Sequence, residues 1–242
     1  MVLAIGLRVT ELAWHRSVAA YAFLKNMQTW IKICGTTSVY DALASIEAGA
    51  DALGFIFAPS KRQITPAAAQ EIIQQLPHEV EKIGVFMDAG AHNIAQVVEQ
   101  VDLTGIQMHG EADFPPEVYG YVSVDRRDSM RKIKTVMVQE GFQDRLDALM
   151  PINGVVDAVL LDSGAGSGRT FDWNDARERL RDRSEKFIIA GGLSPENVGE
   201  AITIFHPWGV DVVSGVEESP GKKDHKKLKA FVAAVRKAES EL

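Results

Sequence analysis

Short apolar segments alternate with longer amphipathic segments, and this eightfold repeat constrains the fold more than any other feature of the chain. The apolar runs begin at Trp30, Ala52, Lys82, Gly105, Lys132, Asp157, Phe187 and Val210. The clearest helical segments between and after them are Ser38–Ala48, Pro66–Leu76, His92–Gln100, Phe142–Met150, Asp172–Arg181, Pro195–Phe205 and Asp224–Ala238. Strands that alternate with helices form parallel sheets, and eight such units close into a barrel. We therefore predict a single-domain α/β fold, a (β/α)8 TIM barrel, over residues 30–242.

Two proline-containing turns and one irregular unit refine this prediction. Thr65-Pro66 and Ser194-Pro195 each place a capping hydroxyl before a proline that suits the first turn of a helix. The fourth unit is the weakest, because residues 114–128 contain two prolines and lack a helical stripe. The alternative fold, an open doubly wound sheet, requires a glycine-rich turn after the first strand. Residues 34–38 do not match the GxGxxG pattern, so the barrel is favoured.

Composition excludes several classes of function. The net charge is −7 without a run of like charges, so nucleic acid is not an expected partner. The single cysteine rules out an internal disulfide and suits the reducing cytoplasm, where we expect the protein to reside. No stretch is long and apolar enough to span a bilayer, so no membrane association is expected. Residues 1–29 do not resemble a signal peptide, and we interpret them as an extension that is either dispensable or packed on the barrel.

Several polar residues are predicted to point into the barrel, because side chains alternate between its interior and its helix-covered face. They are Lys32, Cys34, Gln107, His109, Lys134, Asp162 and Asp211. Active sites of barrels lie at the carboxyl ends of the strands, and Cys34, His109 and Asp162 end theirs, so these three are candidates for chemistry. The two lysines lie lower, where buried ion pairs with acids such as Asp211 are as good an explanation as a role in substrate binding.

Glycine-rich loops follow the last three strands. Residues 190–197 contain Gly191 and Gly192, and residues 214–217 contain Ser214 and Gly215. Barrel enzymes often bind phosphate between the loops after the seventh and eighth strands, where glycine lets the backbone approach the anion. The partner that this arrangement predicts is a small phosphorylated molecule. The loop at residues 164–168 is either a mobile lid or a plain connector.

The motifs at the strand ends together resemble a known family. In chain order they are KICG (Lys32–Gly35), GFIFAPSKR (Gly54–Arg62), GVF (Gly84–Phe86), QMHG (Gln107–Gly110), LLD (Leu160–Asp162), GSGRTFDW (Gly166–Trp173), AGGLSPENV (Ala190–Val198) and DVVSGVEESPGKKD (Asp211–Asp224). This set resembles the phosphoribosylanthranilate isomerases of tryptophan biosynthesis. The resemblance implies an aldose–ketose (Amadori) rearrangement of N-(5-phosphoribosyl)anthranilate to 1-(2-carboxyphenylamino)-1-deoxyribulose 5-phosphate, without metal or cofactor. A monomer and a homodimer are both compatible with it.

The resemblance also implies roles for individual residues. Cys34 would be the general base, Asp162 the general acid, and Arg62 the partner of the anthranilate carboxylate. The glycine loops, with Gly191, Gly192, Ser214 and Gly215, would hold the phosphate, and Gln107, His109 and Asp211 are further candidates for substrate binding. His109 either contacts the substrate or braces the pocket. Two departures are Val213, where the family usually has a serine, and a short loop after Asp162.

Three alternatives are weighed against this interpretation. The analogous isomerase of histidine biosynthesis pairs two aspartates, so Cys34 argues against it. Indole-glycerol-phosphate synthase needs a lysine and a glutamate that the sequence does not clearly provide. A barrel that only binds a phosphorylated ligand would have no use for both Cys34 and Asp162. Isolated cysteines are most often small buried apolar residues, and it is the pairing with Asp162 that favours catalysis.

Overall fold

The computed structural model describes residues 28–110, 115–149, 156–164 and 170–242. Nearly all of the predicted extension, and residues 165–168 of the loop after the sixth strand, lie outside this range. Thr29 already belongs to the folded body: its N–H donates to the carboxylate of Glu239, and its carbonyl accepts from Arg236 Nη1 at 3.0 Å. None of the helices described is long and apolar enough to cross a membrane.

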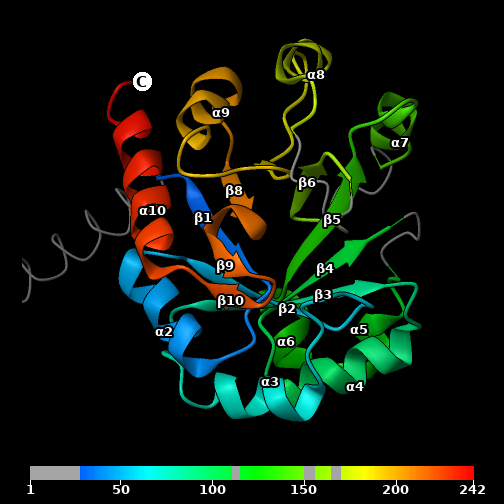
Figure 1. The fold of residues 1–242 in the computed structure, drawn as a ribbon. Helices are drawn as coiled ribbons and strands as arrows, with labels where there is room; N and C mark the ends of the chain where they lie inside the picture. The colour runs from blue at the N-terminus through cyan, green and yellow to red at the C-terminus, as the bar shows by residue number, and fades with distance from the viewer. Residues whose placement is uncertain (1–27, 111–114, 150–155, 165–169) are drawn as a thin grey trace, which may run out of the picture.

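Eight parallel strands form a closed barrel, which confirms the predicted fold (Figure 1). They are β1 (Trp30–Cys34), β2 (Ala52–Ile56), β3 (Glu81–Met87), β4 (Gly105–His109), β5 (Arg131–Met137), β6 (Ala158–Asp162), β7 (Phe187–Ile189) and β8 (Gly209–Val212). Each pairs with the next, and β1 pairs with β8 with Lys32 opposite Asp211. Every strand begins within one residue of its predicted start, because a run of apolar and β-branched residues is a strong local signal.

Helices surround the barrel (Figure 1). They are α2 (Val39–Ala48), α3 (Pro66–Ile73), α4 (Ala91–Val101), α5 (Val118–Tyr121), α6 (Val124–Ser129), α7 (Phe142–Leu149), α8 (Trp173–Arg179), α9 (Val198–Phe205) and α10 (His225–Glu239). The irregular fourth unit forms the two short helices α5 and α6. After β8 come a 3-10 turn (Ser214–Val216) and a hairpin of β9 (Glu217–Ser219) and β10 (Lys222–Lys223).

One of the two predicted caps is correct and the other is wrong. Thr65 caps α3, and its Oγ1 accepts from the N–H of Ala68 at 3.2 Å. Ser194 does not cap a helix, because a turn follows it and α9 begins only at Val198. The Ser194 hydroxyl accepts from Glu196 N–H at 3.3 Å, and its own N–H donates to the Asn197 side chain at 2.8 Å. This local competition for backbone groups delays the start of the helix.

Side chains of the strands divide into two sets, as the alternation predicts. The apolar residues that fill the barrel interior are Trp30, Ala52, Ile83, Ile133, Ala158, Leu160, Ile188 and Ala190. The predicted inward direction is confirmed for five polar residues. Each lies an even number of positions from an interior residue of its own strand, or pairs with a residue of a neighbouring strand that faces inward. They are Lys32, Cys34, Gln107, Asp162 and Asp211.

The predicted direction of Lys134 is wrong. Ile133 belongs to the interior set, and Lys134 pairs with Met108 and Val159, which pack under the helices. The ammonium of Lys134 donates to the Gly110 carbonyl at 2.7 Å. Lys132 and Lys134 alternate with Ile133 and Thr135 in this strand, so polarity alone does not identify the face that points into the barrel. The side chain of Lys134 is long enough to reach a backbone carbonyl at the end of the neighbouring strand.

Lys32 and Asp211 form an ion pair inside the barrel. Their Nζ and Oδ1 atoms are 2.8 Å apart, and the side chains are 0% and 6% exposed. Burial by itself would lower the pKa of Lys32, but Asp211 and, after it, Cys34 together outweigh this effect and the pKa is raised. A buried ion pair therefore spans the β1–β8 seam, as one of the two explanations for Lys32 predicted.

Breaking this pair from one side is expected to destabilise the barrel strongly. Lys32→Met should lower the free energy of unfolding by about 3–5 kcal/mol, because it leaves the Asp211 carboxylate buried without a partner. The double variant Lys32→Met/Asp211→Leu should be less destabilised than Lys32→Met alone. Urea unfolding of the three proteins measures this, and purely additive losses would contradict it.

Candidate active site

Cys34 ends β1 with its side chain toward the barrel axis and is 3% exposed. Space for the thiol exists because the residue opposite it on β2 is Gly54. A Cβ atom at Gly54 would lie 2.5 Å from Cys34 Sγ, so any other residue there would displace the sulfur. The glycine of the GFIF motif therefore positions the thiol.

The electrostatic surroundings of Cys34 act in opposite directions. Burial raises the pKa of the thiol, and the ammonium of Lys32, two residues earlier on the same face, opposes this rise. Asp211 adds to the rise, and the pKa stays above its usual range. The surroundings of Cys34 therefore favour the neutral thiol at physiological pH.

Asp162 ends β6 and is partly exposed. Its Oδ1 accepts from the N–H of Gly164 at 3.0 Å. Burial raises the pKa of this carboxyl group, against the opposing effects of the Gly164 N–H and of His109 at the end of β4. The environment therefore favours the protonated form that a general acid needs.

A small hollow of about 60 Å³ brings several of the nominated residues together. It is lined by Asp162, Gly164, Ala190, Gly191, Gly192, Leu193, Asp211, Val212, Val213 and Ser214. Asp162 thus adjoins the loops after β7 and β8, as the sequence predicts. Cys34 does not line this hollow, but Asp211 does, and Asp211 is paired with Lys32 beside the thiol.

Close backbone approaches hold the three glycine loops against one another. Gly191 and Gly192 have φ angles of 79° and 70°, which favour glycine. A Cβ at Gly191 would overlap Ser163, and one at Gly215 would overlap the carbonyl oxygen of Leu193. The glycines are therefore required for loop packing, independently of any ligand.

Arg62 reaches the mouth of the barrel by crossing over Gly35. A Cβ at Gly35, where φ is 76°, would lie 2.9 Å from Arg62 Cδ. Its guanidinium pairs with Glu217: Nε donates to Oε1 and Oε2 at 2.8 and 3.0 Å, and Nη2 donates to Oε2 at 2.6 Å. Arg62 therefore stands next to Cys34 in a defined orientation.

Gln107 lies inside the barrel, two residues before the end of β4. It is 4% exposed, and its Nε2 donates to Thr135 Oγ1 at 3.1 Å. Its Oε1 is buried and has no hydrogen-bond partner among the described residues. The side-chain oxygen of Gln107 is therefore available to accept a hydrogen bond inside the barrel.

Two buried charges close to Cys34 were not nominated by the sequence analysis. Glu217 and Lys223 are 6% and 3% exposed. In the sequence they stand in the pairs Glu217-Glu218 and Lys222-Lys223, which are typical of a solvated loop. Strand alternation is the one signal that separates them, because one member of each pair faces inward in the β9–β10 hairpin.

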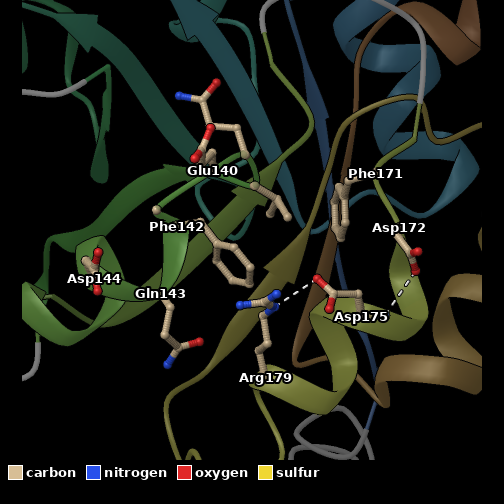
Figure 2. Close-up of a pocket in the computed structure, with 11 residues that line it drawn as sticks. Glu140, Phe142, Gln143, Asp144, Phe171, Asp172, Asp175 and Arg179 are labelled. Atoms are coloured by element: carbon tan, nitrogen blue, oxygen red, sulfur yellow. Dashed lines mark hydrogen bonds and ion pairs between the residues drawn. The ribbon is translucent and has the colours of Figure 1, made fainter.

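A larger hollow of about 440 Å³ lies elsewhere, between α7 and α8, and Figure 2 shows Phe142, Phe171 and Arg179 around it. Arg179 lies over the Phe142 ring at 5.7 Å and pairs with Asp175 at 2.8 Å. None of the nominated residues lines it. Among the described residues, no group of three or more His, Cys, Asp or Glu side chains is placed to hold a metal ion.

Comparison with known proteins shows which family the chain matches. Residues 31–234 match the model of the family described as N-(5'phosphoribosyl)anthranilate (PRA) isomerase. The enzyme of that name from Thermotoga maritima is 41% identical over 207 residues, which cover 84% of this chain and 96% of that protein. The one from Oceanobacillus iheyensis is 38% identical over 209 residues, or 86% and 97% of the two chains.

Solved structures give the same result. A crystal structure of the T. maritima isomerase has a TM-score of 0.74 at 40% identity, covering 87% of this chain and all of that one. A phosphoribosylanthranilate isomerase in complex with reduced 1-(o-carboxyphenylamino)-1-deoxyribulose 5-phosphate has a TM-score of 0.71 at 38% identity with the same coverage. The chain belongs to the N-(5'-phosphoribosyl)anthranilate isomerase family.

Proposed function

We propose that this chain isomerises N-(5'-phosphoribosyl)anthranilate in tryptophan biosynthesis, with Cys34 as general base and Asp162 as general acid. The observation that carries the proposal is the placement of these two groups at the ends of β1 and β6, both within electrostatic reach of the Lys32–Asp211 pair. The names of the relatives support the substrate. The family model matches residues 31–234, which supports residues 30–242 as the catalytic domain.

The reaction needs one proton delivered and one removed. Asp162 donates a proton to the furanose ring oxygen, the bond from that oxygen to C1 of the sugar breaks, and an iminium forms between C1 and the anthranilate nitrogen. The iminium acidifies the hydrogen on C2, which Cys34 removes. The resulting enolamine takes up a proton at C1 and loses the proton of its C2 hydroxyl group, which gives the ketone. Every step is an acid–base step, and the rearrangement is a redox exchange within the substrate.

The protonation states of Asp162 and Cys34 suit the order of the two proton transfers. Burial favours protonated Asp162, so the acid is available before the ring opens. Burial favours the neutral thiol of Cys34, and Lys32 opposes the rise in its pKa. The cationic iminium adds positive charge close to the sulfur at the step that needs a thiolate, so the base is formed when it is required.

Binding is divided between the two ends of the substrate. Arg62 holds the anthranilate carboxylate, since its guanidinium is fixed beside Cys34. The loops carrying Gly191, Gly192, Ser214 and Gly215 hold the phosphate, and three of these residues line the hollow next to Asp162.

The remaining nominated residues act on the sugar. Gln107 offers its unpartnered Oε1 as an acceptor, Asp211 lines the hollow, and His109 stands close enough to Asp162 to affect its pKa. Val213 lines the same hollow, so this position supplies no hydroxyl to the phosphate.

Removing either proposed acid–base group should slow turnover without weakening binding. Cys34→Ser and Asp162→Asn should each lower kcat by at least about a hundredfold, with little change in KM, because a positioned acid or base contributes that much. The loss of substrate fluorescence with purified protein measures the rate. A Cys34→Ser variant that keeps more than about a tenth of parental kcat would show that the thiol is structural. No turnover by the parent would favour a barrel that only binds phosphorylated ligands.

The thiol should ionise only at alkaline pH in the empty enzyme. Its raised folded-state pKa keeps it protonated through neutral pH, and the thiolate appears as the pH rises above the ordinary range of cysteine. Lys32→Met should raise this pKa further, since the ammonium opposes the rise. The ultraviolet absorbance of the thiolate, taken as a difference from Cys34→Ser, follows one group because the chain has one cysteine. A thiolate already present at neutral pH contradicts the prediction.

A substitution in the proposed carboxylate site should leave the affinity for phosphate unchanged. Arg62→Ala should raise KM more than it lowers kcat if Arg62 holds the carboxylate equally in the ground and transition states. Inorganic phosphate should inhibit this variant as strongly as the parent, because its site lies on the opposite loops. Competition assays measure both quantities, and an equal loss of phosphate affinity would refute the assignment of separate sites.

A further inference from the structure

Two charged residues of the β9–β10 hairpin are buried although their neighbours are exposed. Glu217 and Lys223 are 6% and 3% exposed. Glu218 and Lys222, one position away from each, pair with one another at 2.8 Å with side chains about 60% and 65% exposed. Burying charges is costly unless they are paired or used, so the inner pair needs an explanation that the outer pair does not.

Glu217 fixes one edge of the Arg62 guanidinium. It takes the Nε–H and one Nη2–H of Arg62 in a bidentate arrangement with distances of 2.6 to 3.0 Å. No residue that the structure describes pairs with Nη1. Since a guanidinium is planar and its donors have fixed directions, occupying one edge aims the remaining donors. The free edge of Arg62 is the one left for a carboxylate.

Lys223 supplies the second positive charge of this cluster. Its Nζ lies 3.3 Å from Glu217 Oε1 and donates to the carbonyl oxygens of Cys34 and Val213 at 2.6 and 3.4 Å. These hydrogen bonds connect the hairpin to the strand end that carries the proposed base (Figure 1). The backbone of Lys223 is anchored in turn, because its N–H donates to Asp41 Oδ2 at 3.1 Å.

The charge balance of the three side chains favours an anion. An arginine paired with a glutamate alone is neutral and has little attraction for a further carboxylate. Burial lowers the pKa of Lys223, and the Glu217 carboxylate 3.3 Å away opposes this shift. With Lys223 protonated, the cluster contains two cations and one anion, so one positive charge is left over. A substrate carboxylate on the free edge of Arg62 would make the group neutral.

We propose that Glu217 and Lys223 are positioning residues of the carboxylate site: Glu217 orients the guanidinium of Arg62, and Lys223 supplies the net positive charge and ties that site to the Cys34 carbonyl. The inference rests on the proposed function, because it assumes that Arg62 receives the anthranilate carboxylate. The ligand class is an aryl carboxylate, and the same lysine fixes where the aryl group sits relative to the proposed base.

The effect of removing Glu217 on substrate binding distinguishes an orienting role from a competing one. If Glu217 only neutralised Arg62 and competed with the substrate, its removal would release the guanidinium and tighten binding. If Glu217 orients Arg62, its removal weakens binding of molecules that carry the carboxylate. The sign of the change therefore separates the two roles.

The experiment compares paired variants with two inhibitors. Glu217→Gln and Lys223→Met are tested beside the matched controls Glu218→Gln and Lys222→Met. The inhibitors are reduced 1-(o-carboxyphenylamino)-1-deoxyribulose 5-phosphate and its counterpart without the carboxyl group. For the inner variants, KM and the inhibition constant of the carboxylated inhibitor should rise at least about tenfold, as for the loss of one hydrogen bond to a charged group. Values for kcat should stay within about threefold, and the inhibitor without the carboxyl group should bind unchanged.

Each other outcome overturns the proposal. Unchanged or tighter binding of the carboxylated inhibitor by folded Glu217→Gln refutes the orienting role. An equal loss for both inhibitors shows a general structural effect. Should Glu217→Gln fail to fold, Lys223→Met decides by the same comparison, since a role in the charge balance predicts the same selective loss. Equal effects of the outer variants also refute the proposal. A parent protein that does not turn over the substrate refutes the proposed function itself, and the inference with it.

Discussion

The buried ion pair between Lys32 and Asp211 is the interaction on which the rest of the site depends. It joins the first and last strands inside the barrel, where neither charge is tolerated without the other. Cys34 follows on the same face of β1 and senses both members of the pair, and Asp162 senses them from β6. The ion pair across the β1–β8 seam therefore also contributes, after burial, to the electrostatic environment of the two groups proposed to move protons.

Above this ion pair, the geometry of the site depends on glycines, which leave space where any other residue would place a side chain. Gly54 leaves room for the sulfur of Cys34, and Gly35 lets Arg62 cross over the end of β1. Gly191 and Gly215 let the loops after β6, β7 and β8 touch through their backbones. The carboxyl ends of all eight strands lie around one mouth of the barrel, and glycine allows the groups proposed for catalysis and binding to approach one another there.

Positive charge at the mouth is arranged through the hairpin that follows β8. The chain carries a net charge of −7, so an anionic substrate requires cations concentrated at the site. The pairing of Arg62 with Glu217 alone would cancel that charge, and Lys223 restores it. Because Lys223 also donates to the carbonyl of Cys34, a hydrogen bond joins the proposed carboxylate site to the proposed base.

The sequence by itself determined the barrel, the strand starts and the inward direction of Cys34, Asp162 and Asp211, because the periods of strands and helices are local properties of the chain. It did not determine the direction of Lys134, where polar residues occupy both faces of β5. Tertiary structure alone decided which buried charges meet. Arg62 and Glu217 are 155 residues apart in the sequence. No local pattern predicts their pairing, because the two residues meet only when the barrel has folded.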